Sequence, residues 1–137
     1  MMSVEEAIIV NAPIEEVYEQ WTHIEDFPKF MPAVLEMRRV DETHFHWVVE
    51  RGGRNYEATF QIVLRIPQRR IAWRTVSGSE SSGVVCFDPE VGRKTRVTFK
   101  MVYAPDAGWD SPAALLRRLK LRLGKFKALM EAIHTNS

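Results

Sequence analysis

The sequence predicts an α+β domain in which a curved antiparallel sheet of about seven strands wraps around a long C-terminal helix. Residues 34 to 103 alternate with the period of two that strands have, whereas apolar residues after position 110 recur with a helical period. Glycine and proline divide the alternating region into consecutive strands. With 137 residues, 45% of them apolar, the chain can fill one core, so we assign 1–137 to a single domain.

Charge and composition exclude several classes of protein. The 19 Lys and Arg residues nearly balance the 18 Asp and Glu residues, so no global field favours nucleic acid or membranes. Met1–Glu6 has no basic or apolar leader, and no apolar run of about 18 residues occurs. Cys86 is the single cysteine, which excludes an internal disulfide. We therefore expect a cytoplasmic protein.

The first third of the chain predicts one strand and two short helices. Val4–Val10 reads as a strand, and Pro13 suits the start of a helix whose positive end favours Glu15 and Glu16. One face of that helix carries Ile14, Val17, Tyr18 and Trp21. Residues 24–32 contain two prolines, so we expect the second helix to be broken.

The alternating region predicts a six-strand meander. Its clearest strand places Tyr56, Ala58, Phe60, Ile62, Leu64 and Ile66 on one apolar face. Other inward sets are Phe45, Trp47 and Val49; Ile71 and Trp73; and Val97, Phe99, Met101 and Tyr103. Turns are expected at 52–53, 67–68 and 88–92, with a flexible connection over 77–83 that could form a mobile rim. A strand of about 13 residues spans roughly 40 Å, so the sheet must bend.

The last helix is predicted from Asp110 to His134. Ser111 is a plausible N-cap, and Pro112 then occupies the first helical position. The apolar stripe consists of Leu115, Leu116, Leu119, Leu123, Phe126, Leu129, Met130 and Ile133. The opposite face carries Arg117, Arg118, Lys120, Lys125 and Lys127, with Leu121 exposed among them.

This order of elements resembles the helix-grip fold of the START-like superfamily. Within it, the chain is similar to the polyketide cyclase/dehydrase group, which includes coenzyme-Q-binding proteins. The similar segments are Trp21, Ile24-Glu25-Asp26-Phe27-Pro28-Lys29-Phe30-Met31-Pro32, Ile71-Ala72-Trp73, Gly83-Val84-Val85-Cys86-Phe87 and Thr95-Arg96-Val97. The resemblance implies a space between sheet and last helix that holds lipids, quinones, sterols, polyketides or plant hormones.

The inward aromatic residues form either the wall of a ligand pocket or a fully packed core. In the pocket alternative, the Tyr56 hydroxyl could orient a ligand oxygen through one hydrogen bond. The candidate ligand-binding residues are Trp47, Tyr56, Phe60, Trp73, Thr75, Ser77, Phe99, Met101, Leu119, Leu123 and Phe126.

The sequence contains no catalytic, metal or cofactor motif that we can identify. His44 and His46 lie on one strand face without a third ligand, so we read them as facing solvent. Cyclases of the similar group use an inward arginine on the strand that carries the tryptophan. Here Arg74 has the opposite phase to Trp73.

Three functions remain open. The first is a carrier or sensor that holds a hydrophobic small molecule without chemistry. The second is a polyketide cyclase, aromatase or dehydratase with Tyr56, Thr75 and Ser77 as polar groups. The third is an interaction protein whose basic helix face contacts an anionic membrane or the ribosome. We predict no cofactor, and the oligomeric state stays open.

Overall fold

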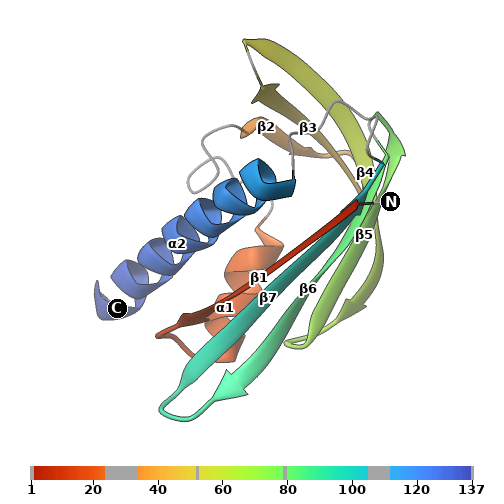
Figure 1. The fold of residues 1–137 in the computed structure, drawn as a ribbon. Coiled ribbons are helices and arrows are strands. Elements are labelled where there is room, and N and C mark those ends of the chain that lie inside the picture. The colour runs from red at the N-terminus through yellow and green to blue at the C-terminus, as the bar shows by residue number, and fades with distance from the viewer. Residues whose placement is uncertain (1, 24–33, 52, 79, 105–111, 137) are drawn as a thin grey trace.

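Seven antiparallel strands form one curved sheet, and the long helix α2 lies across its concave side (Figure 1). The computed structural model describes residues 2–23, 34–51, 53–78, 80–104 and 112–136. The elements are β1 (Met2–Val10), α1 (Ile14–Thr22), β2 (Val34–Arg39), β3 (His44–Arg51), β4 (Arg54–Ile66), β5 (Arg70–Ser77), β6 (Ser81–Glu90), β7 (Lys94–Tyr103) and α2 (Pro112–Asn136). This arrangement confirms the predicted fold class.

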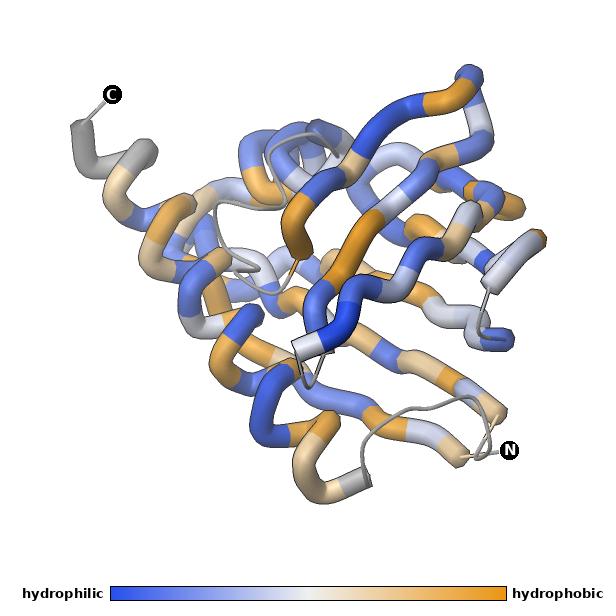
Figure 2. The backbone as a smooth tube through the Cα atoms, turned by 90° about the horizontal axis from the view of Figure 1, so that it is seen from above, coloured by the Kyte–Doolittle hydropathy of each residue, from blue (hydrophilic) through white to orange (hydrophobic). Residues whose placement is uncertain are grey.

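The strand order is β1-β7-β6-β5-β4-β3-β2, so β2 to β7 form the predicted meander of sequential neighbours. β1 joins the far side by pairing with β7, from Met2 opposite Tyr103 to Val10 opposite Thr95. β1 and β2 are therefore the two edges of the sheet. Hydrophobic and hydrophilic residues alternate along the strands in Figure 2, as expected for a sheet with one covered face.

Both described helices follow their predicted patterns. α1 begins directly after Pro13 and buries Val17 and Trp21. α2 begins at Pro112, the predicted first helical position, and ends at Asn136, two residues later than predicted. Its buried residues are Leu115, Leu119, Leu123, Phe126 and Met130, whereas Leu121 is 61% exposed, as the stripe predicted. The predicted N-cap Ser111 and the broken helix over 24–32 lie outside the described residues. No helix among the described residues has the length and apolar character needed to span a membrane.

β4 departs from the predicted alternation after Ile62. Its register with β5 shifts between Ile62 and Leu64. Ile62 is paired with Trp73, but Leu64 is paired with Ala72, so Val63 is an extra residue in β4. Such a β-bulge reverses which side the following residues face. The prediction that Leu64 and Ile66 point inward is therefore wrong; they are 40% and 43% exposed.

Two predicted turns are shorter than expected. β6 continues to Glu90, so the turn falls at residues 91–93 and Pro89 is part of a strand. The Phe87 backbone N–H donates to Arg69 O, toward β5, and the nitrogen of Pro89 points to the same side. Pairing between β6 and β5 ends at Cys86, so no hydrogen bond to β5 is required at Pro89, whose nitrogen carries no hydrogen. The connection expected over 77–83 is likewise reduced to residues 78–80, and Gly83 lies within β6.

Polar contacts fasten the C-terminal half of α2 to the end of β1. The Lys127 ammonium donates to Ile9 O (3.0 Å) and pairs with Glu131, while the Asn11 backbone N–H donates to Glu131 Oε2 (2.9 Å). The hydrogen bond from Lys127 is the main reason that the pKa of Glu131 is lowered. Lys127 was predicted to face away from the sheet, but its long side chain instead reaches back to β1.

A buried hydrogen bond ties β7 to the connection between β1 and α1. Thr95 is fully buried, and its hydroxyl donates to Ala12 O at 2.8 Å. The isosteric substitution Thr95→Val would remove this hydrogen bond to the Ala12 carbonyl oxygen. We expect it to lower the free energy of unfolding by about 1–2 kcal/mol, measured by urea denaturation. Thr98→Val, at a half-buried position of the same strand, should change it by less than about 0.5 kcal/mol. Equal effects of the two variants would contradict this role of the Thr95 bond.

Candidate ligand-binding cavity

A cavity of about 100 Å³ lies between the concave face of the sheet and α2. Its wall is built by side chains from every strand and from both described helices. The lining residues are Val4, Trp21, Thr22, Met37, Trp47, Phe60, Ile62, Arg65, Ile71, Trp73, Thr75, Ser81, Phe99, Met101, Leu115, Leu119 and Arg122. Most of these described residues are apolar, and none of them is an Asp or Glu. The cavity therefore suits an apolar molecule.

Aromatic contacts shape the floor of the cavity. The rings of Trp73 and Phe99 lie 5.2 Å apart, and those of Trp47 and Phe60 lie 5.9 Å apart in an edge-to-face arrangement. The Trp73 indole covers Gly83 on the neighbouring strand: a Cβ atom added to Gly83 would lie 2.3 Å from Trp73 Cζ2. The glycine thus leaves the space in which this indole rests.

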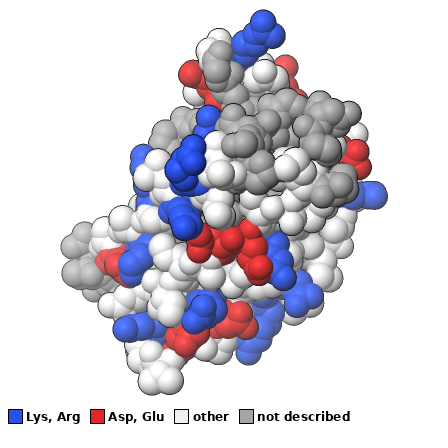
Figure 3. Space-filling view, in the orientation of Figure 1, with Lys and Arg blue, Asp and Glu red and all other residues white. Residues whose placement is uncertain are grey.

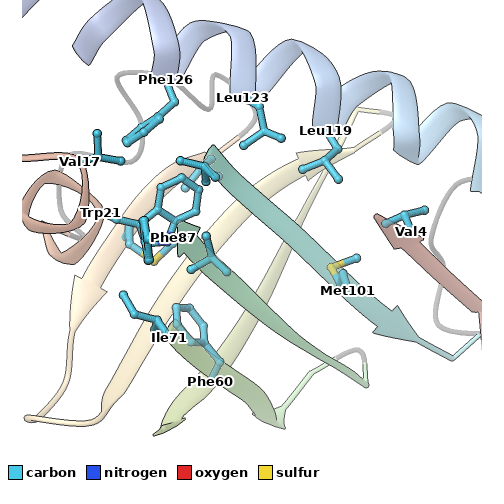
Figure 4. Packing of buried hydrophobic residues seen from close by; sticks show 14 of the residues in the cluster. Val4, Val17, Trp21, Phe60, Ile71, Phe87, Met101, Leu119, Leu123 and Phe126 are labelled. Atoms are coloured by element: carbon cyan, nitrogen blue, oxygen red, sulfur yellow. The ribbon is translucent and has the colours of Figure 1, made fainter. Parts of the chain in front are cut away.

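A packed cluster closes the end of the cavity near α1. The Trp21 ring lies 4.9 Å from Phe126 and 6.2 Å from Phe87, and Tyr18 contacts Phe87 at 5.4 Å. Figure 4 shows Phe126, Leu123 and Leu119 pointing from α2 toward the sheet, with Trp21 beside Phe126. Phe126 and Leu123 are almost wholly buried. The two alternatives drawn from the sequence both occur: this end is packed core, and the rest encloses a cavity.

The structure brings together most of the predicted ligand-binding residues. Those that line the cavity are Trp47, Phe60, Trp73, Thr75, Phe99, Met101 and Leu119. Leu123 and Phe126 belong to the packed cluster, and the half-buried Tyr56 lies on β4 opposite Val49 without lining the cavity. A ligand-binding role for all of these residues stays a prediction.

Ser77 does not have the predicted inward phase. The register between β4 and β5 also shifts near the end of β5. Phe60 is paired with Thr75, whereas Thr59 is paired with Ser77. Val76 is therefore an extra residue, and Ser77 shares the outward side of Thr59. It is exposed and is not a lining residue.

The Thr75 hydroxyl is engaged with the neighbouring strand. It donates to Ser81 O at 3.1 Å and accepts from the Ser81 backbone N–H at 2.9 Å. Both bonds span the short β5–β6 connection. Thr75 thus holds this hairpin together at the cavity wall, which reduces its availability as a proton donor to a ligand.

The cavity also contains two arginines that sequence reasoning missed. Arg65 follows the bulge in β4, so it faces the cavity although the alternation placed it outward. Burial raises the pKa of the Tyr18 hydroxyl, and the positive charge of Arg65 opposes that rise. Arg122 lines the cavity from α2, three residues after Leu119. Its helical position could have revealed it, whereas no pattern in the sequence marks the bulge that turns Arg65 inward.

The two histidines of β3 each have acceptors outside the cavity. His46 contacts Thr59 Oγ1 and Glu57 Oε1, both at 3.1 Å. His44 Nδ1 lies 2.9 Å from Asp41 Oδ1. The backbone N–H of Thr43 and the hydrogen bond with His44 lower the pKa of Asp41 to about 2. These contacts lie at the β2–β3 turn and on the outer face, away from the lining residues.

Charges of both signs lie close together on the face seen in Figure 3. On α2, Lys120 is 3.6 Å from Glu6 of β1, and Lys127 pairs with Glu131. The basic helix face is therefore partly neutralised. Its contact with an anionic membrane or the ribosome stays a prediction.

Comparison with known proteins identifies the family. Residues 10–123 match the family described as polyketide cyclase/dehydrase and lipid transport. The chain belongs to this family. An uncharacterized 17.2 kDa protein of Streptomyces lincolnensis is 36% identical over 136 residues, which cover 96% of this chain and 91% of that protein.

Solved structures confirm the START-like fold of this family member. A protein of Deinococcus radiodurans superposes with a TM-score of 0.76 at 26% identity, covering 93% of this chain and 95% of that one. A START superfamily protein of Mycobacterium smegmatis gives 0.74 at 14% identity, with 98% and 99% covered. The Zhui aromatase/cyclase of Streptomyces sp. R1128 gives 0.71 at 16% identity, with 95% and 93% covered. The last two show a shared fold alone.

Proposed function

We propose that this protein binds a hydrophobic small molecule in the cavity between the sheet and α2, as a carrier or sensor. The observation that carries the proposal is an unfilled apolar space beside a closely packed core. Protein interiors are normally packed with few voids larger than a water molecule. An apolar space of this size is therefore best explained by a ligand that occupies it.

The volume limits what the cavity accepts without change. A cavity of about 150 Å³ holds a benzene molecule, and pockets for drug-sized ligands measure about 300–1,000 Å³. At about 100 Å³, this cavity has room for part of a ring or a short chain. A larger ligand requires its flexible lining residues, such as Met37, Met101 and Leu119, to change rotamer.

Titration with N-phenyl-1-naphthylamine, a neutral apolar fluorophore, tests this proposal. Trp21, Trp47 and Trp73 line the cavity, so saturable binding should quench their emission by energy transfer to the probe. Leu119→Trp fills the cavity from α2 and should weaken binding by at least about tenfold. Leu121→Trp introduces the same ring on the exposed face of that helix and should bind like the wild type. Equal binding by both variants would place the probe elsewhere and overturn the proposal.

A cyclase acting in the same cavity is the second candidate. The family name and the presence of Arg65 and Arg122 at the cavity favour it, because a guanidinium can stabilise a developing enolate. Incubation with a synthetic poly-β-keto thioester, followed by mass spectrometry, distinguishes the candidates. Loss of water with formation of a ring at a rate above the uncatalysed reaction would establish catalysis. An unchanged substrate that co-elutes with the protein would support carriage.

A further inference from the structure

Arg65 lies where the cavity meets solvent. It is one of the lining residues, yet it remains exposed. The bulge at Val63 fixes this position, because it turns Arg65 to the side of Ile62 while Leu64 and Ile66 face outward. Arg65 is paired in register with Ile71, which is buried and also lines the cavity. Strand pairing therefore fixes the backbone of Arg65 at the edge of the cavity.

The N–H donors of the Arg65 guanidinium are available to a ligand. Among the described parts of the chain, no hydrogen bond or salt bridge to this side chain is found, in contrast to Arg96, whose Nε lies 3.0 Å from Glu90. None of the described residues that line the cavity is an Asp or Glu that could neutralise it. A guanidinium presents five N–H donors in a planar fork that matches a carboxylate or a phosphate.

We propose that the ligand is an amphipathic acid whose apolar body fills the cavity and whose carboxylate or phosphate pairs with Arg65 at its mouth. This inference rests on the proposed binding function and specifies the class of ligand. The lining separates into the two parts that such a molecule needs: an apolar wall of aromatic and aliphatic residues, and a cation at the edge. Arg122 adds a second positive charge from α2.

The arrangement distinguishes ligands by charge. An anionic group at the mouth keeps some of its hydration and gains charge-assisted hydrogen bonds, so its desolvation cost is smaller than in the closed interior. A neutral head group of the same length gains less from Arg65. A cationic head group would be repelled by both arginines.

Three ligands with one apolar tail test the inference: octanoate, octyl phosphate and 1-octanol, each titrated by calorimetry. We expect Arg65→Gln to weaken binding of octanoate or octyl phosphate by about tenfold and to change 1-octanol binding by less than about twofold. Arg70→Gln is the matched control. Arg70 is an exposed arginine on β5, next to Ile71 in sequence but on the opposite side of the sheet, and its substitution should affect none of the three ligands.

The outcomes separate the two proposals. A loss confined to octanoate assigns a carboxylate to Arg65, and a loss confined to octyl phosphate assigns a phosphate; both support the inference. If 1-octanol binds but neither acid is weakened by Arg65→Gln, the charge assignment is overturned while the binding function stands. If Arg70→Gln weakens the acids as much as Arg65→Gln, general surface charge explains the effect and the inference is also overturned. If none of the three ligands binds, both proposals fail.

Discussion

The substitution Gly83→Ala is expected to lower the free energy of unfolding by about 3 kcal/mol and to move an indole into the cavity. The added Cβ would lie 2.3 Å from Trp73 Cζ2 and 2.7 Å from the Lys100 carbonyl oxygen. The carbonyl is part of the β7 backbone, which pairs with β6 along its length, so the ring is the more mobile neighbour. The Trp73 ring lines the cavity, and its displacement should also weaken binding of the naphthylamine probe.

Gly124→Ala provides the matched control for this prediction. A Cβ at Gly124 would meet no atom within 4 Å, and the position lies inside α2. Alanine there should raise the free energy of unfolding by about 0.5–1 kcal/mol, because glycine is unfavourable within helices. Both values are measurable by chemical denaturation. A Gly83→Ala protein as stable as the wild type, with unchanged tryptophan emission, would show that Trp73 does not rest on Gly83.

The substitution Phe126→Ala is expected to lower the free energy of unfolding by about 3–5 kcal/mol. Phe126 is fully buried, and its ring packs edge-to-face on Trp21. Its removal would open a cavity between α1, α2 and the sheet, which the neighbouring rings can fill only in part. A domain of this size is typically stable by about 5–15 kcal/mol, so the variant should unfold at a much lower denaturant concentration.

Leu121→Ala shows whether this loss comes from burial. Leu121 lies on the same helix but is largely exposed, so its truncation should change stability by less than about 0.5 kcal/mol. Phe126→Leu should recover part of the loss, because leucine restores apolar volume without the ring contact. A Phe126→Ala variant that keeps its stability but loses ligand binding would instead assign Phe126 to the ligand, as the sequence first indicated.

The elements of this fold were predictable because each has a strong periodic pattern. The stripe from Leu115 to Met130 predicts α2 and its covered face, and the alternation from Tyr56 to Ile62 predicts β4 up to the bulge. Turn residues separate the strands of the meander. These periodic patterns and turn residues are local along the chain. They can therefore be read from a single sequence without an alignment.

The polar part of the site was less predictable, because single extra residues decide it. Val63 and Val76 are ordinary β-branched residues, and nothing in their identity marks them as bulges. Yet the first brings Arg65 to the cavity and the second turns Ser77 away from it. A register shift by one residue exchanges the two faces of a strand, so an error at one position changes every later assignment on it.

The pairing of β1 with β7 has a consequence for how the chain folds. Met2 is paired with Tyr103, and the Asn11 backbone N–H donates a hydrogen bond to Glu131, which lies 120 positions later in the sequence. During synthesis, β1 therefore emerges from the ribosome long before either of its partners, and its edges stay unpaired for that time. The meander from β2 to β7 needs only neighbouring strands and can assemble first. We expect docking of β1 to be a late, slow step, since closing such long loops costs entropy before any contact compensates for it.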